Sequence, residues 1–143
     1  TNRTRDNLIN KYRTDRCLDT GIFGTPVLLE TLFREGAADL AVDLLVRRTD
    51  ASFARMMECG ATTLWETWDG LASHNHPMFG GVVKLLFTEI LGIRQTKAAG
   101  FEAYEILPAD IPSITWAEGY ITTASGRIEV RWERDYQGKQ QIR

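Results

Sequence analysis

The chain has 143 residues, of which 17 are basic and 19 acidic, giving a net charge of −2. This length suffices for one domain with a buried core, or slightly more. The basic residues are dispersed, so nothing favours nucleic acid or an anionic membrane as a partner. The longest apolar run, 82–87, is interrupted by Lys84 and is too short to span a bilayer.

Two further features bear on processing and redox state. The chain starts at Thr1 rather than Met, which suggests a processed or excised segment and leaves the compartment open. Cys17 and Cys59 lack the spacing of a zinc site, so we expect two buried or half-buried thiols rather than a disulfide or a ligand pair.

The first part of the chain has a helical pattern. Thr25 resembles an N-cap before Pro26 at the first helical position, and Gly36 is expected to end that helix. Apolar positions at helical spacing predict three more helices, over 37–48, 52–58 and from Pro77 to a cap at Gly92. Gly80 and Gly81 weaken the last of these, so a neighbouring helix or a ligand should approach them closely.

After residue 95 the period falls to two. Ile128, Val130 and Trp132 alternate with charged residues, which predicts a half-buried strand paired in a hairpin with 120–123. Further strands are expected over 101–107 and 114–116, and Trp116 and Trp132 should both lie in the core. The predicted fold is therefore mainly α, with antiparallel helix pairs followed by a C-terminal β unit.

Residues 60–76 carry the clearest chemical signal. They place Glu66 between Trp65 and Trp68, with His74 and His76 shortly after. Indole faces stack on sugar C–H bonds, polar side chains hydrogen-bond hydroxyls, and a carboxylate among them can move a proton. This combination indicates a carbohydrate site.

Simpler interpretations compete with this one. The spacing of Thr63 and Glu66 fits a capping box, in which Glu66 would only satisfy a main-chain N–H at a helix start. On such a helix Trp65 and Trp68 would share a face, with Trp65 in the core. Asp69 would lie one turn from Glu66, on the same side of a sugar, and so would be a poor general acid.

The roles of the histidines and of Asn75 are open to more than one interpretation. His74 and His76 have no third ligand nearby, so we expect no metal and no cofactor. His76 either contacts a sugar or caps the helix that begins at Pro77. Asn75 either touches substrate or, more simply, orients the loop.

The order of these blocks resembles the C-terminal end of a bacterial α-L-rhamnosidase of glycoside hydrolase family 78. The block at Gly60–Gly70 is close to that family's G-A-T-T-hydrophobic-W-E-x-W-D pattern. The resemblance runs from about residue 15 to 134, through blocks at 19–25, 37–41, 48–53, 60–70, 75–76, 79–80, 91–94 and 119–132.

The resemblance implies a fold and an activity. Residues 1–95 would form the last helix pairs of an (α/α)6 catalytic barrel, and 96–143 part of an antiparallel β-sandwich. Such enzymes remove terminal α-L-rhamnosyl residues with inversion. Glu66 matches the general base and His76 a rhamnose contact. By their own chemistry, Trp68 and Asn75 are further substrate-binding candidates. Thr62 and Asp19 are candidate supporting groups.

The resemblance also implies what this chain does not supply. The general acid lies in the first half of the barrel, so the upstream helices of the barrel are an expected partner. The expected substrate is a rhamnose-containing glycoside. Only residues 70–74 separate the W-E-x-W-D block from the Asn-His pair, a shorter loop than in many members, which leaves linkage and aglycone preference open. A His is frequent where Cys17 stands, so no role is assigned to that thiol.

Two alternatives remain. The chain could be a non-catalytic helical and β module that binds a sugar or another chain, because one carboxylate cannot invert a glycoside alone. A barrel acting on another deoxy sugar or a uronic acid is the other possibility.

Overall fold

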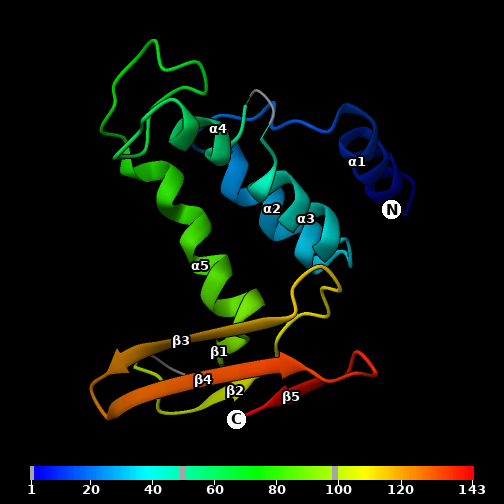
Figure 1. Cartoon of the computed structure of the whole chain (residues 1–143), viewed down its shortest axis with the longest axis vertical. Coiled ribbons are helices and arrows are strands. Elements are labelled where there is room, and N and C mark those ends of the chain that lie inside the picture. Colours follow the sequence, from blue (N-terminus) through cyan, green and yellow to red (C-terminus); the bar gives the residue numbers. More distant parts are fainter. Residues whose placement is uncertain (1, 49–50, 98–99) are drawn as a thin grey trace. The chain divides into compact units, whose positions relative to one another are not determined.

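The computed structural model describes residues 2–48, 51–97 and 100–143. Thr49 and Asp50, which belong to the block at 48–53, lie outside the described residues. The chain forms two compact units, Thr1–Val82 and Val83–Arg143 (Figure 1). The expected boundary between barrel and sandwich portions after residue 95 stays a prediction.

The first unit is helical. Its elements are α1 (Asn2–Asp15), α2 (Gly24–Arg34), α3 (Ala38–Val46), α4 (Phe53–Glu58) and the 3₁₀ segment η1 (Pro77–Val82). Helices α2 and α3 pack side by side, and η1 contacts α2 (Figure 1). The apolar faces of α2 and α3 bury Leu28, Leu29, Leu32, Ala41 and Leu44, as the helical spacing predicts.

The start of α2 differs from the prediction. The helix begins at Gly24, so Thr25 lies inside the first turn and is not the N-cap. Its buried hydroxyl instead donates to the Thr20 carbonyl at 3.0 Å and lies 2.8 Å from the Thr20 hydroxyl. Thr25 therefore ties the preceding segment to the helix. The predicted stop is confirmed: Gly36 has a φ of +77° and donates to the Phe33 carbonyl.

Two other local predictions hold. The helix predicted over 52–58 forms as α4, with Ser52 as its N-cap, whose side chain accepts a hydrogen bond from the Arg55 N–H. A Cβ on Gly81 would lie 3.0 Å from Cγ of Pro26, so helix α2 does approach this glycine closely. The cysteines fit only in part, because Cys17 is half-buried but Cys59 is exposed, and both are free thiols.

The second unit is mixed. It begins with α5 (Val83–Leu85) and the π-helical η2 (Leu86–Ile90), and five strands follow. The strands are β1 (Ile93–Gln95), β2 (Tyr104–Ile106), β3 (Trp116–Thr123), β4 (Gly126–Arg134) and β5 (Gln140–Ile142). They make two antiparallel sheets, β1-β2 and β3-β4-β5. The helical first part and antiparallel second part are thus confirmed.

The hairpin is confirmed, but one strand is not. β3 pairs with β4 from Trp116 opposite Glu133 to Thr123 opposite Gly126. The strand expected over 114–116 does not form, because Ile114 closes a turn onto Ile111 and only Trp116 enters β3.

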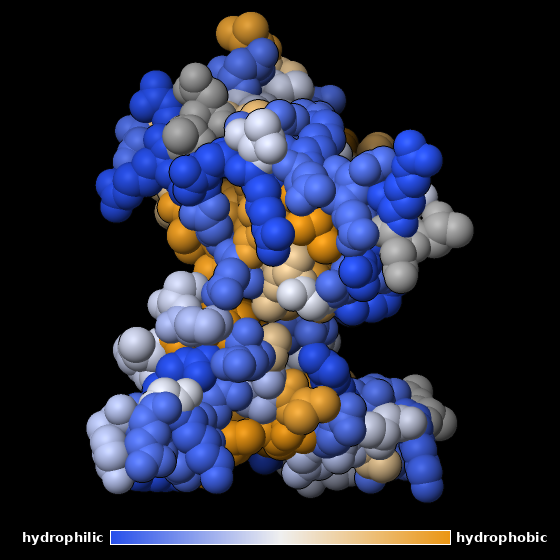
Figure 2. All heavy atoms as spheres, turned by 90° about the vertical axis from the view of Figure 1, so that its right-hand side faces the viewer, coloured by the Kyte–Doolittle hydropathy of each residue, from blue (hydrophilic) through white to orange (hydrophobic). Residues whose placement is uncertain are grey.

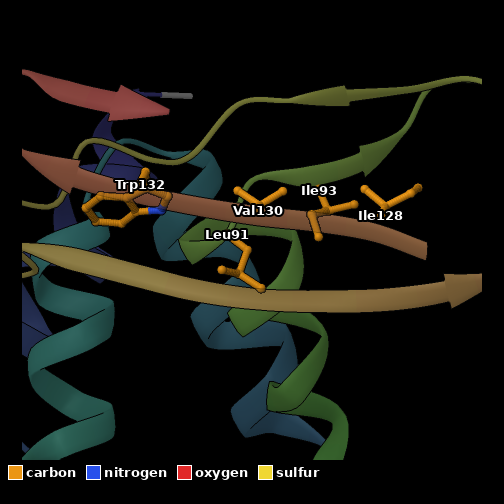
Figure 3. Packing of buried hydrophobic residues seen from close by; sticks show 5 residues of the cluster. All are labelled: Leu91, Ile93, Ile128, Val130 and Trp132. Carbon is orange, nitrogen blue, oxygen red and sulfur yellow. The ribbon is translucent and has the colours of Figure 1, made fainter. Parts of the chain in front are cut away.

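The core of the second unit lies along β4. Ile128, Val130 and Trp132 point toward Leu91 and Ile93 (Figure 3). Trp132 is fully buried, and its indole N–H donates to the Ile90 carbonyl at 2.8 Å. Trp116 is 60% exposed, so the prediction that it lies in the core is wrong. It shares the outward face of β3 with Glu118 and Tyr120.

Apolar side chains also reach the surface. Phe23, Val27 and Val46 in the first unit and Leu107 in the second are more than half exposed. Figure 2 shows apolar patches set among hydrophilic atoms on the face it presents. Within residues 2–48, 51–97 and 100–143, no helix has the length and apolar character that crossing a membrane requires.

Candidate active site

Residues 61–76 form a folded-back loop, which corrects the expectation of a helix at Glu66. No helix begins between Ala61 and His76, so the capping box does not form and the residues 65, 66, 68 and 69 do not share helical turns. The Glu66 N–H donates to the Ser73 carbonyl at 2.8 Å, and the His76 N–H donates to the Leu64 carbonyl at 2.7 Å. The Thr63 hydroxyl also donates to the His74 carbonyl. These bonds join the first limb of the loop, residues 61–66, to its second limb, residues 73–76.

The loop brings the carboxylate of Glu66 and the imidazole of His76 together. The Oε2 atom of Glu66 lies 3.5 Å from Nδ1 of His76 and accepts a hydrogen bond from the Ser73 N–H at 3.3 Å. The Glu66 side chain is 39% exposed and that of His76 25% exposed. The separation of 3.5 Å is an ion-pair distance, but the alignment gives no hydrogen bond, so Nδ1 is buried without a hydrogen-bond partner among the described residues.

Trp65 forms the buried floor of the loop. It is buried with Met56 and Phe79, which confirms its predicted place in the core. The His74 ring stacks on its indole, with centroids 4.5 Å apart and planes 15° apart. Since a carbonyl only accepts, Nε2 of His74 is the donor in its 2.8 Å contact with the Gly70 carbonyl. His74 is therefore a structural residue of the loop.

Trp68 joins the loop to the segment before α2. Its indole N–H donates to the Thr20 carbonyl at 2.8 Å. Its ring contacts Phe53 and Phe79, with centroid distances of 5.1 and 4.3 Å. The half-buried indole is thus held from its edge, and its role in stacking on a sugar stays a prediction.

Asn75 and Asp69 lie on the surface of the loop. The Asn75 N–H donates to the Ser73 hydroxyl at 3.3 Å, and the residue is exposed. Asp69 accepts hydrogen bonds from the Thr67 hydroxyl at 2.6 Å and the Leu71 N–H at 3.0 Å. These bonds, the hydroxyl first, hold the pKa of Asp69 below its ordinary value. Asp69 orders its own turn, and substrate contact by Asn75 stays a prediction.

Asp19 has partners that the sequence did not reveal. It accepts hydrogen bonds from the Lys11 ammonium and from the Tyr12 hydroxyl, the latter at 2.5 Å. These donors lower the pKa of Asp19. Burial and the bond to Asp19 raise the pKa of Tyr12 to about 12. Lys11 and Tyr12 lie on α1, which no sequence pattern predicted, so this cluster had no visible signal.

A hollow of about 280 Å³ lies beside the loop. Its walls come from α4 and from the start of the loop and are mostly apolar, with two threonines: Phe53, Met56, Met57, Ala61, Thr62, Thr63 and Leu64. Thr62 is therefore a wall residue of this hollow. Glu66 is not among these lining residues and is half-buried. Within the described ranges no three His, Cys, Asp or Glu side chains are grouped so that they could hold a metal.

Comparison with known proteins places the chain in a family. Residues 1–90 match the family model described as the bacterial alpha-L-rhamnosidase 6 hairpin glycosidase domain. Named alpha-L-rhamnosidases of Alteromonas sp. (strain LOR) and Streptomyces avermitilis are 35% and 32% identical, each over 82% of this chain. The chain spans only 14% and 12% of the length of these two relatives.

Solved structures give the same result. An alpha-L-rhamnosidase from Dictyoglumus thermophilum is similar with a TM-score of 0.79 and 32% identity, over 87% of this chain and 14% of that one. The Streptomyces avermitilis alpha-L-rhamnosidase complexed with L-rhamnose has a TM-score of 0.84 and 30% identity, over 92% of this chain and 14% of that one. The family model covers well over half of the chain, so the chain belongs to the bacterial alpha-L-rhamnosidase 6 hairpin glycosidase domain family.

Proposed function

We propose that this chain is part of an inverting glycoside hydrolase that removes terminal α-L-rhamnosyl residues, and that Glu66 is its general base. In this proposal the helices belong to the end of an (α/α)6 barrel and the strands to a β-sandwich. The general acid comes from the remainder of the barrel, outside this chain. The substrate is a rhamnose-containing glycoside, in keeping with the similar enzyme that was crystallised with L-rhamnose.

The observation that carries the proposal is the environment of the Glu66 carboxylate. Its Oε2 is held by the Ser73 N–H, and its Oε1 makes no hydrogen bond within the described residues. The side chain is partly exposed, so a water can reach it. A fixed carboxylate with one unused oxygen has the geometry that a general base needs.

The reaction follows from these groups. Glu66 takes a proton from a water as the oxygen of that water bonds to the anomeric carbon. The bond from this carbon to the leaving oxygen breaks on the opposite face, where an acid donates the second proton. The two carboxyl groups of an inverting pair stand roughly 6.5–9.5 Å apart. Asp69, bound into its own turn, is not assigned the acid role.

The neighbouring side chains have supporting roles in the proposal. His76 and Asn75 would contact rhamnose hydroxyls from the second limb of the loop, and Trp68 would offer part of its ring to the sugar. The Trp68 N–H bond to Thr20 keeps this ring from turning. A rigid indole is a good surface for sugar C–H bonds because little side-chain entropy is lost on binding.

The product anomer tests the mechanism. Hydrolysis of an aryl α-L-rhamnoside by the complete enzyme, followed by NMR from the first minutes, should release β-L-rhamnose before mutarotation. First release of the α anomer would contradict inversion. A panel of aryl glycosides tests which sugar the enzyme prefers. Faster turnover of a uronide or of another deoxy sugar would reject rhamnose as the substrate.

A further inference from the structure

His76 faces Glu66 with one particular nitrogen. Nδ1 lies 3.5 Å from the Oε2 of Glu66, and this nitrogen is buried. Oε2 is also the oxygen that accepts the Ser73 N–H. Both approaches therefore come from the second limb of the loop, and both lead to the same carboxylate oxygen.

The main chain fixes this arrangement. The His76 N–H bonds the Leu64 carbonyl at 2.7 Å, and the Glu66 N–H bonds the Ser73 carbonyl at 2.8 Å. The two side chains therefore start from segments whose main chains are hydrogen-bonded to each other. The two atoms lie 3.5 Å apart, and hydrogen bonds between catalytic groups often tighten only when substrate is bound.

A buried ring nitrogen without a partner is costly, and the only titratable group within ion-pair distance of Nδ1 among the described residues is Glu66. The tautomer of a histidine is set by the hydrogen bond that one of its nitrogens makes. A carboxylate only accepts, so Nδ1 carries the proton. Nε2 then has a free lone pair, which can accept a hydrogen bond from a sugar hydroxyl.

We infer that His76 is a positioning residue for Glu66, donating from Nδ1 to Oε2 while Nε2 accepts from the bound sugar. Oε2 is thereby the anchored oxygen and Oε1 the one that takes the proton of the water. This inference rests on the proposed function of Glu66. It adds that one ring couples sugar binding to the orientation of the base.

Two near-isosteric variants separate the two nitrogens. In His76→Asn the amide nitrogen can occupy the place of Nδ1, whereas in His76→Gln it occupies that of Nε2. His76→Ala removes both. His74→Gln is the matched control, because it changes the other imidazole of the loop while its amide nitrogen can keep the bond of Nε2 to the Gly70 carbonyl. Circular dichroism melting of each variant checks that it folds, and if His76→Ala does not, the Asn and Gln pair still decides.

The readout is the pH profile of kcat/KM on an aryl rhamnoside, with kcat and KM measured separately. Loss of the donor to the charged carboxylate should move the acidic limb of His76→Gln and His76→Ala to higher pH by about half a unit or more. The same two variants should lose kcat about tenfold. His76→Asn should keep the position of the acidic limb and most of kcat but raise KM. His74→Gln should keep the acidic limb, kcat and KM of the parent.

Two outcomes would overturn the inference. One is an acidic limb that does not move in His76→Ala, and the other is a His76→Asn variant whose limb moves as far as that of His76→Gln. A Glu66→Gln variant measured alongside separates the two proposals. If it keeps its turnover, Glu66 is not the base and the proposed function fails. If it is inactive while no His76 variant moves the limb, only the positioning role fails.

Discussion

Gly70 lies against the indole of Trp65 so closely that a Cβ on Gly70 would be 2.7 Å from Cζ3 of the ring. Gly70 also has a φ of +71°, a conformation in which L side chains are strained. The same indole carries the stacked ring of His74 on the far limb of the loop. Gly70 therefore allows the packing of Trp65 and His74 that holds together the loop presenting Glu66.

Gly70→Ala should lower the free energy of unfolding by about 2–4 kcal/mol, since the left-handed backbone and the overpacking each contribute. Gly60→Ala is the matched control. Its φ is +85°, but a Cβ there meets nothing within 4 Å, so only the backbone cost of about 1–2 kcal/mol remains. Urea unfolding of both variants measures the difference. Equal losses would mean that the Trp65 contact does not constrain the loop.

Trp132→Phe should destabilise the second unit by about 2–4 kcal/mol, because it opens a cavity and leaves the Ile90 carbonyl without its donor. Trp132 is fully buried and makes that bond at 2.8 Å. Trp116→Phe, on the exposed face of β3, should change stability by less than about 0.5 kcal/mol. Thermal melts of the two variants compare the positions, and a larger shift for Trp116 would contradict the assigned core.

The Tyr12–Asp19 pair predicts how stability depends on pH. Asp19 has a lowered pKa, so its contribution is present above its ordinary value of 3.8 and is lost as the pH falls below it. Tyr12 has a pKa raised from 10.0 to about 12. Its contribution is therefore complete below pH 10 and is lost as the pH rises toward 12.

Denaturant unfolding across this alkaline range checks the sign. Tyr12→Phe should show a shallower loss of stability than the parent between pH 10 and 12. It should not become flat, because the raised pKa of Lys11 acts in the same direction. Asp19→Asn should in turn remove part of the acid dependence. A parent whose stability rises between pH 10 and 12 would contradict the Tyr12 assignment.

Sequence patterns predicted the parts of the fold that depend on local order. The end of α2 at Gly36 and the short helix after Ser52 were both predicted, because helix ends depend on only a few neighbouring residues. The alternation of Ile128, Val130 and Trp132 placed three side chains in the core for the same reason. By contrast, α1 is mostly polar, and its apolar stripe is limited to Leu8, Ile9 and Tyr12, so this short pattern was not recognised as a helix.

Local sequence patterns did not predict the conformation of the loop 61–76. The spacing of Thr63 and Glu66 fits a capping box, but the N–H of Glu66 bonds Ser73 instead of starting a helix. Trp116 was also misplaced, because it takes an outward-facing position at the start of β3, and a tryptophan alone does not reveal which face of a strand it occupies. The meeting of Glu66 and His76 likewise depends on the pairing of two segments and not on spacing along one helix.

Deprotonation of water by the Glu66 carboxylate is the step on which the proposed function depends. Its test is the turnover of an aryl α-L-rhamnoside by the complete enzyme carrying Glu66→Gln, beside an Asp69→Asn variant that changes the neighbouring carboxylate bound into its own turn. We expect Glu66→Gln to lower kcat at least about a hundredfold while Asp69→Asn stays within about tenfold of the parent. Turnover of Glu66→Gln close to that of the parent would contradict the account.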